Sequence, residues 1–282
     1  LIQSGGTLEI GGGELIVAGD YRIQSKQVAS NGTVTYSASS GYLKMTQASD
    51  VVEIGGQFIM QSQYSHEGWL TAGTMDLKGH FTQLSASVSD NFRTSGAHKV
   101  ILSGHQQQVI SMNSDNSSFF NILKMSNTSG EGVKFATRVY VNKELQPTTT
   151  PIVDGHNLIL TTNVPISWAS WHANLGLDGN RSLQQDVTIE GDLHIYGGTI
   201  HLNGHKLTVK GSLYQLGGML DLAGGEVQVQ GNVVHSGGTL AINEGQLNVE
   251  GSYRMQSERV DANGTVTYGY SHGGLQMIKA SD

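Results

Sequence analysis

The sequence predicts an all-β chain that forms a right-handed parallel β-helix (β-solenoid), with three short strands in each coil of about 20 residues and a few projecting loops. Three observations predict this fold. Glycine recurs at a constant step along the chain, at Gly191, Gly211, Gly231 and Gly251. Apolar columns keep the same step, one of them being Leu193, Leu213 and Val233. Within each period apolar and polar residues alternate, which is typical of a strand with one buried face.

Each regular period divides into three expected strands, which in the first copy span 192–196, 199–203 and 206–210. The breaks fall on Gly-Gly pairs, on Asn-Gly or Ala-Gly steps, and on the single glycines. Glycine adopts positive φ without a side-chain clash, so we expect all three breaks to be corners of that kind. Stacked coils bury the apolar face that one coil cannot bury, and equivalent residues then lie about 4.8 Å apart. An antiparallel meander is the alternative, but it requires hairpin turns, whereas here the register returns only after three strands.

A longer repeat is superimposed on the coils. Residues 1–50 recur as residues 233–282, an offset of 232, with 28 of 50 positions identical. The hexapeptide Asn-Gly-Thr-Val-Thr-Tyr, for example, occurs at 31–36 and again at 263–268. The chain therefore holds one module and the first fifth of the next, and we expect it to be a piece of a longer tandem protein.

Four segments follow from these patterns. Residues 1–50 begin a module and carry an excursion after Tyr21, whose Asn31-Gly32 step predicts a small projecting hairpin. Residues 186–282 form regular coils that run into the next module. Between them lie irregular coils at 51–145 and a loop-rich segment at 146–185 that contains Pro147, Pro151 and Pro165. For the two irregular segments we expect strands at 98–103, 108–112, 120–126, 133–136, 138–141 and 157–161, a polar loop at 85–96, and a short helical turn near 167–174.

Composition narrows the classes of function. The 282 residues include 38 Gly, no Cys and only 14% charged residues, with a net charge of −7. Without cysteine there is no disulfide framework and no thiol chemistry. The basic residues are scattered, so we expect no nucleic acid partner and no attachment to an anionic membrane. The sequence has no apolar run long enough to cross a bilayer, so we expect no membrane span.

The acidic residues and histidines do not form a recognisable site. In the regular coils Glu226 shares a column with Lys206 and Gln246, and Asp221 shares one with His201. No acidic ladder results, so we expect no enzyme activity and no catalytic or cofactor-binding residue. His201 and His205 fall on different faces of a strand–turn–strand path, so we also expect no metal site.

Four aromatic residues are candidates for binding a glycan. Trp69 lies near Tyr64 at the start of a coil, and Trp168 and Trp171 bracket two small residues in the loop-rich segment. Exposed tryptophan and tyrosine faces stack on sugar rings, so a groove lined by these side chains would bind a polysaccharide. The bland alternative, which we expect first, is that the indoles plug the core beneath a loop.

Several segments resemble parts of known proteins. His98-Lys99-Val100-Ile101-Leu102-Ser103-Gly104, the run 108–111 and the runs 120–127 and 132–137 are similar to segments of bacterial cell-surface and secreted tandem-repeat β-solenoid proteins of the adhesin or fibre type. The resemblance covers about half of the chain directly, and the rest is similar only in its general pattern of small glycine-rich strands. It implies a rod-like architecture shared by adhesins, filament-forming proteins and polysaccharide-binding proteins, and it brings no catalytic residues.

These observations lead to three hypotheses about function. The first is a structural, extracellular or cell-surface repeat protein, bacterial by its resemblance, that forms a stiff rod or fibre and whose partners are neighbouring modules or identical subunits stacked end to end. The second is a carbohydrate-binding surface protein that uses Tyr64, Trp69, Trp168 or Trp171. The third is a pectate-lyase-like enzyme that acts on polysaccharides, which requires carboxylates and basic residues gathered on one face.

Overall fold

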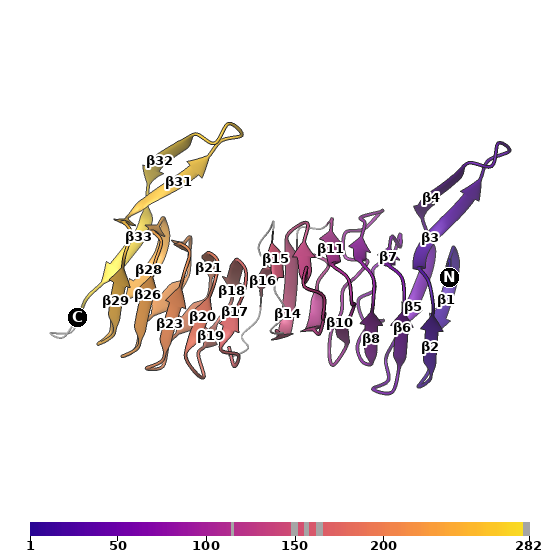
Figure 1. Ribbon diagram of the computed structural model, residues 1–282, viewed down its shortest axis with the longest axis horizontal. Helices are drawn as coiled ribbons and strands as arrows, with labels where there is room; N and C mark the ends of the chain where they lie inside the picture. The colour runs from indigo at the N-terminus through magenta and orange to yellow at the C-terminus, as the bar shows by residue number, and fades with distance from the viewer. Residues whose placement is uncertain (114–115, 148–151, 155–157, 162–165, 279–282) are drawn as a thin grey trace. The chain divides into compact units, whose positions relative to one another are not determined.

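The computed structural model describes residues 1–113, 116–147, 152–154, 158–161 and 166–278. In these residues the chain is all-β and forms a parallel β-solenoid of about 9 turns (Figure 1). The described residues contain no helix, and therefore none that is long and apolar enough to cross a membrane. The chain divides into two compact units, Leu1–Asn157 and Leu158–Asp282.

The first unit is built from irregular coils. One parallel sheet runs in the order β2 (Glu14–Val17), β6 (Val51–Ile54), β8 (Thr74–Leu77), β10 (Lys99–Leu102), β12 (Phe120–Met125) and β14 (Val139–Gln146). A second parallel sheet runs in the order β3 (Tyr21–Val28), β7 (Phe58–Met60), β9 (Phe81–Gln83), β11 (Gln108–Met112), β13 (Val133–Phe135) and β15 (Ile152–Asp154). On the third side β1 (Gly5–Glu9) pairs with β5 (Ser40–Lys44), and single bridges such as Met45–Leu70 and Leu70–Thr94 continue the stack.

Coil length in the first unit varies because of the loops. Val51 pairs with Thr74, Thr74 with Lys99, and Lys99 with Ile122, so every one of these coils is longer than a regular coil and their lengths differ. The longer coils enclose larger side chains. Phe58, Phe81, Phe92 and Phe120 are fully buried, and the rings of Phe81 and Phe92 lie 4.8 Å apart in an edge-to-face contact. Phe92 comes from the expected polar loop at 85–96, which therefore contributes to the core as well as to the surface.

The second unit is built from the regular coils. Its three parallel sheets share one aliphatic core between them. The first contains β16 (Leu158–Leu160), β18 (Leu175–Asp178), β21 (Leu193–Gly197), β24 (Leu213–Gln215), β27 (Val233–His235) and β30 (Tyr253–Arg254); the second contains β17 (Ser170–Trp171), β20 (Val187–Ile189), β23 (Lys206–Val209), β26 (Glu226–Val229) and β29 (Gln246–Val249); the third contains β19 (Arg181–Ser182), β22 (Thr199–His201), β25 (Met219–Asp221), β28 (Gly237–Ala241) and β33 (His272–Gln276).

The register of the second unit confirms the period seen in the sequence. Leu193 pairs with Leu213, and Leu213 pairs with Val233, all of them buried. The neighbouring column Ile200, Leu220 and Leu240 is aligned in the same way. Apolar side chains one period apart are therefore vertical neighbours, as the sequence predicts.

Two kinds of glycine occur at the corners, and for one of them the expectation of positive φ was wrong. In the pairs that recur at the constant step, Gly197-Gly198 and Gly217-Gly218, the second glycine has positive φ, 71° at Gly198 and 63° at Gly218. The single glycines Gly211 and Gly231 do not. A Cβ at Gly231 would lie 2.6 Å from the carbonyl oxygen of Gly211. The single glycines are required because successive coils approach closely, not because of a special backbone angle.

Side chains beside the single glycines form a hydrogen-bonded ladder. Oδ1 of Asp192 accepts a hydrogen bond from the backbone N–H of Ser212 at 2.7 Å. Oγ of Ser212 accepts one from the backbone N–H of Asn232 at 3.1 Å, and Oδ1 of Asn232 accepts one from that of Ser252 at 2.9 Å. These contacts satisfy backbone donors at a corner, where the polypeptide leaves one sheet for the next.

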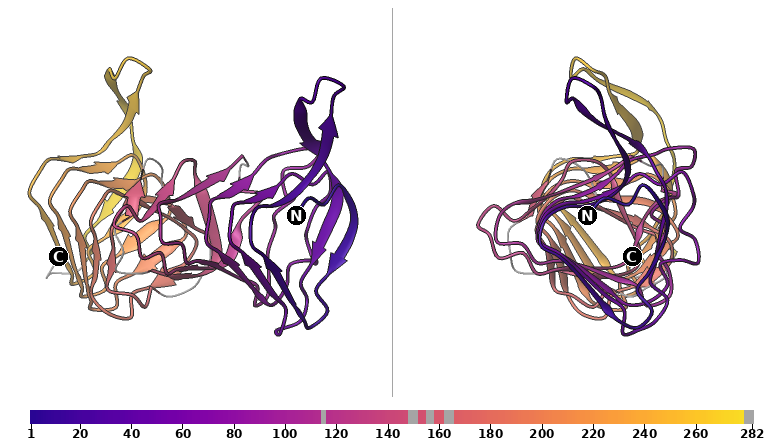
Figure 2. Two further views of the ribbon diagram at one scale, coloured as in Figure 1. Left: turned by 45° about the vertical axis from the view of Figure 1, so that its right-hand side comes forward. Right: turned by 90° about the vertical axis from the view of Figure 1, so that its right-hand side faces the viewer.

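The expected hairpin is present in both copies of the module (Figure 2). β3 continues beyond its sheet and pairs antiparallel with β4 (Val34–Ala38), and β31 (Gln256–Val260) pairs antiparallel with β32 (Val266–Tyr270). The two registers are identical at an offset of 232, since Lys26 pairs with Tyr36 and Glu258 with Tyr268. Each hairpin projects away from the coils of its own unit (Figures 1 and 2).

The irregular segments agree with the remaining predictions in part. Strands β10, β11, β12, β13 and β16 occupy the expected ranges, and β14 extends beyond its range to Gln146. The helical turn expected near 167–174 is wrong, because Trp171 pairs with Ile189 as part of a β-sheet. In the loop-rich segment, Pro151 and Pro165 lie outside the described residues.

Candidate functional site

Three aromatic rings form a pile on the surface of the first unit, which we call the aromatic ledge: Tyr42, Tyr64 and Trp69. The rings of Tyr42 and Tyr64 are stacked, with centroids 5.2 Å apart and planes at 6°. Tyr42 also stacks on Trp69, with centroids 4.6 Å apart and planes at 27°. Tyr42 is therefore the ring that both pairs share.

The ledge follows from the stacking of two successive coils. Tyr42 belongs to β5, where its neighbours Gly41 and Leu43 are buried, so the alternation of the strand places Tyr42 on the outer face. Tyr64 and Trp69 come from the following coil. The bridges Ser39–Ser62 and Met45–Leu70 align that coil with β5 on both sides of Tyr42. The ledge thus rests on backbone pairing rather than on a free loop.

His66 forms hydrogen bonds with both of the coils that carry the ledge. Its ring is fully buried, its Nε2 accepts a hydrogen bond from the backbone N–H of Leu43 at 3.2 Å, and its Nδ1 lies 3.3 Å from the carbonyl oxygen of Tyr64. A neutral ring with the proton on Nδ1 satisfies both contacts. Burial lowers the pKa of His66 to about 4, so the neutral form predominates at physiological pH.

Charged groups flank the ledge. Nε of Arg93 lies 3.6 Å from Oε1 of Glu67, and the guanidinium also lies over the ring of Phe119, 5.5 Å from its centroid. Arg93 and Phe119 are paired across adjacent coils. Flat apolar rings beside an exposed ion pair can stack on a ligand and hydrogen-bond to it at the same time. A sugar suits such a site, because its ring has an apolar face and its hydroxyl groups form hydrogen bonds.

Of the four predicted aromatic residues, Tyr64 and Trp69 belong to the aromatic ledge, whereas Trp168 and Trp171 lie in the second unit. Tyr64 is exposed and Trp69 is half-buried, and both contact Tyr42. Sequence reasoning missed Tyr42, although the alternation of Tyr42 with the inward Leu43 was a signal for an outward ring. In the second unit Trp171 is fully buried and its Nε1 donates to the carbonyl oxygen of Asn174 at 3.1 Å.

Trp171 therefore fills the core, as the bland alternative proposed. Its ring lies 6.3 Å from that of the half-buried Trp168. Trp168 keeps part of its surface accessible, but the aromatic ring beside it belongs to a core residue.

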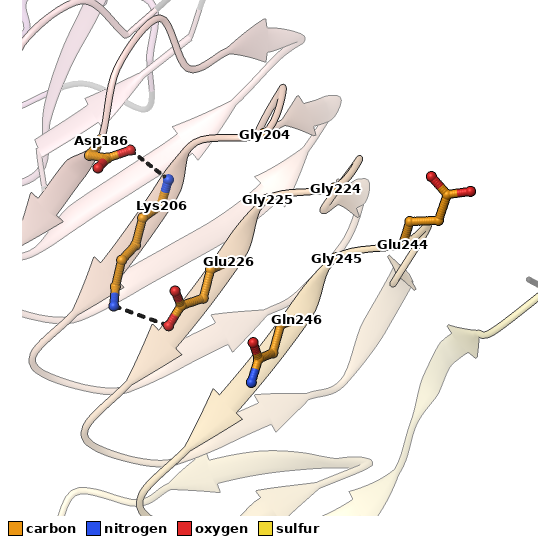
Figure 3. Close-up of a pocket in the computed structure, with 9 residues that line it drawn as sticks. All are labelled: Asp186, Gly204, Lys206, Gly224, Gly225, Glu226, Glu244, Gly245 and Gln246. Carbon is orange, nitrogen blue, oxygen red and sulfur yellow. Dashed lines mark hydrogen bonds and ion pairs between the residues drawn. The ribbon is translucent and has the colours of Figure 1, made fainter. Parts of the chain in front are cut away.

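A polar groove of about 670 Å³ follows one corner of the second unit (Figure 3). Oδ1 of Asp186 accepts a hydrogen bond from the backbone N–H of Lys206 at 2.9 Å, and Nζ of Lys206 lies 3.0 Å from Oε1 of Glu226. Glu244 is directed away from this pair (Figure 3). The groove therefore contains one partly exposed ion pair, Lys206–Glu226, and one hydrogen bond from a backbone N–H to a carboxylate.

Two other pairs of side chains in the regular coils lie in contact in the same way, one period apart. Lys210 Nζ lies 2.6 Å from Oε2 of Glu190, and His201 Nδ1 lies 3.0 Å from Oδ2 of Asp221. Among the described residues, no group of three or more histidine or acidic side chains is arranged to hold a metal ion. The aromatic ledge is therefore the site whose geometry best fits a ligand.

Comparison of the chain with protein-family models, with curated proteins and with solved structures found no match.

Proposed function

We propose that this chain is part of a structural, extracellular repeat protein that forms a stiff rod or fibre, with neighbouring modules or identical subunits stacked end to end as its partners. The observation that carries the proposal is the structural recurrence of the module. β28 pairs with β33 in the same register in which β1 pairs with β5, one module further along the chain, and the hairpin that separates each pair recurs with it.

The packing supports a mechanical role. Each regular coil contributes one residue to every apolar column and one backbone rung to every sheet, so adding coils lengthens the structure without changing its cross-section. Each coil adds about 4.8 Å. In such a stack every interior coil is held by its neighbours on both sides.

Small-angle X-ray scattering and electron microscopy test this proposal. We expect an elongated particle for residues 1–282, and a proportionally longer particle when a further complete module is added. Compact globules, or a length that does not grow with the number of modules, would contradict it.

We also propose a bacterial cell-surface or secreted location, on the basis of the resemblance to surface repeat proteins. A membrane-impermeant amine reagent, added to intact cells that produce the protein, should label its exposed lysines, such as Lys134. Labelling that requires cell lysis would refute the location.

A second candidate function is glycan binding at the aromatic ledge, supported by the pile of Tyr64, Tyr42 and Trp69 beside the Glu67–Arg93 pair. Pull-down on insoluble polysaccharides measures it. Trp69→Ala and Tyr64→Ala should each weaken binding by about fivefold, since each removes about 1 kcal/mol of stacking. Trp168→Ala is the matched control and should leave binding unchanged. Failure of the parent chain to bind any polysaccharide removes this function.

We propose that the chain is not a polysaccharide lyase. The support is that two carboxylates of the regular coils form ion pairs with lysines of adjacent coils, Lys206–Glu226 and Lys210–Glu190, and a third, that of Asp192, accepts a hydrogen bond from a backbone N–H. An assay for unsaturated products released from pectate and other anionic polysaccharides should show no activity. Release of such products would restore the enzyme hypothesis.

A further inference from the structure

The two projecting hairpins have one apolar face each. Cross-strand partners share a face, so Val28 and Val34 lie together with Lys26 and Tyr36 on one side of the first hairpin. The opposite side carries the polar residues Ser25, Gln27, Thr35 and Ser37. The second hairpin repeats this arrangement. Its apolar face comprises Val260 and Val266 at the tip, then Glu258 and Tyr268, then Gln256 and Tyr270 at the base.

These apolar faces are open to solvent within the chain. Val28 is 61% exposed and Val260 57% exposed, and Tyr270 at the base of the second hairpin is 95% exposed. The first hairpin contacts its own unit only near its base, where Oγ of Ser25 donates to the carbonyl oxygen of Ser4 at 3.3 Å and Nε2 of Gln24 donates to Oε1 of Gln61 at 2.7 Å, among the contacts of the described residues. A two-stranded hairpin with an uncovered apolar face is marginally stable by itself, and a second layer would stabilise it.

The two faces differ in the sign of one charge. Lys26 lies opposite Tyr36 in the first hairpin, and Glu258 occupies the same position opposite Tyr268 in the second. Both hairpins also carry an arginine against the tyrosine. The guanidinium of Arg22 lies over the ring of Tyr36, and that of Arg254 lies over the ring of Tyr268.

This difference favours unlike pairs of hairpins. Two first hairpins placed face to face would bring two lysines together, and two second hairpins would bring two glutamates together. A first and a second hairpin instead make Lys26 and Glu258 diagonal neighbours, so only the mixed pair is complementary at this level of the contact.

We propose that the β3–β4 hairpin of one molecule docks face to face on the β31–β32 hairpin of a second copy of this chain. With the tips aligned, as in sheet-on-sheet packing, valines meet valines, and one step below Lys26 lies over Tyr268 and Glu258 over Tyr36, so that the lysine and the glutamate are diagonal neighbours across the contact. The contact is heterologous, because each molecule offers two different surfaces. Such a contact does not close on itself and links molecules into open chains.

A single contact of this kind is small. One face of a two-stranded hairpin is well below the area of a standard stable interface, so the association is weak and depends on concentration. A protein that carries a hairpin in every module would strengthen the linkage through multivalency. The contact between hairpins thus joins rods side by side and does not depend on stacking at the ends of the rods.

Charge reversal tests the proposal by sedimentation velocity of residues 1–282 over a wide range of protein concentration. The wild type should self-associate. Lys26→Glu and Glu258→Lys should each weaken association by about tenfold or more, because each places like charges at the centre of the contact. Lys134→Glu and Glu131→Lys change the net charge equally at exposed positions elsewhere in the first unit and should behave as wild type.

Two rescue experiments complete the design. The double variant Lys26→Glu with Glu258→Lys should regain association. A mixture of the two single variants should also regain it, since every first hairpin then finds a second hairpin of opposite charge. A wild type that stays monomeric, reversals that act no differently from the controls, or absence of rescue would each overturn the proposal. Association that is unaffected by all the variants would assign assembly to other surfaces and leave the rod proposal intact.

Discussion

Ala223 occupies a position at which the adjacent coils have asparagine. It has positive φ, 43°, as do Asn203 and Asn243 in the adjacent coils. A left-handed backbone costs an alanine about 1 kcal/mol that asparagine largely avoids. We expect Ala223→Asn to raise the free energy of unfolding by about 1 kcal/mol, measured by urea denaturation. Ala223→Ser adds a polar group without the left-handed preference and should give no such gain; equal gains from both variants would contradict the explanation.

The corner ladder gives a second prediction for a single residue. Asp192→Ala leaves the backbone N–H of Ser212 without its acceptor and should cost about 1–2 kcal/mol. Asp192→Asn keeps an acceptor, as Asn174 and Asn232 do in the same column, and should cost little. The free energies of unfolding of the two variants decide the matter: an equal loss in both would show that the charge matters rather than the hydrogen bond.

His66 couples the ledge to pH. Its pKa falls from 6.5 to about 4 on folding, because its ring is buried, so between these values the unfolded chain binds more protons than the folded one. The free energy of unfolding should therefore be highest above pH 6.5 and fall by roughly 3 kcal/mol toward pH 4 from this residue. Urea unfolding at a series of pH values should show a smaller slope for His66→Gln. The exposed His272→Gln is the control, and an unchanged slope in His66→Gln would refute the assignment.

At the scale of the element, the coil is the unit of stability, and what matters is whether another coil covers it. Leu43 in β5 and Leu275 in β33 occupy the same position of the module. Leu43 is 0% exposed beneath the following coil, whereas Leu275 is 43% exposed. Met45 and Met277 show the same contrast.

This contrast predicts unequal effects of one substitution. Leu43→Ala should lower the free energy of unfolding by about 2–5 kcal/mol, because it opens a cavity. Leu275→Ala should lower it by less than about 1.5 kcal/mol, because much of the side chain already contacts water. Urea denaturation of the two variants compares them directly. Equal costs would mean that burial by the next coil does not set the stability of these positions.

At the scale of the whole molecule, modules should support one another. A chain extended beyond Asp282 by a copy of residues 51–113 would place a coil over Leu275, as the segment 51–83 covers Leu43. In that longer chain the cost of Leu275→Ala should rise toward that of Leu43→Ala. If the cost stays low, the repeated sequence does not continue the coil, and the rod proposal loses its main support.

Strict periodicity allowed the sequence alone to determine the regular part of the protein. With a constant step and alternating side chains, Leu193 can only stack on Leu213, and the module repeat places two equivalent hairpins. Only the tertiary structure decided the irregular part. Coils of unequal length have no fixed columns, so the neighbours of a side chain depend on where each loop returns to the stack. For this reason Tyr42 joins Tyr64 and Trp69 on the surface, while Trp171, in an equally polar stretch of sequence, lies in the core.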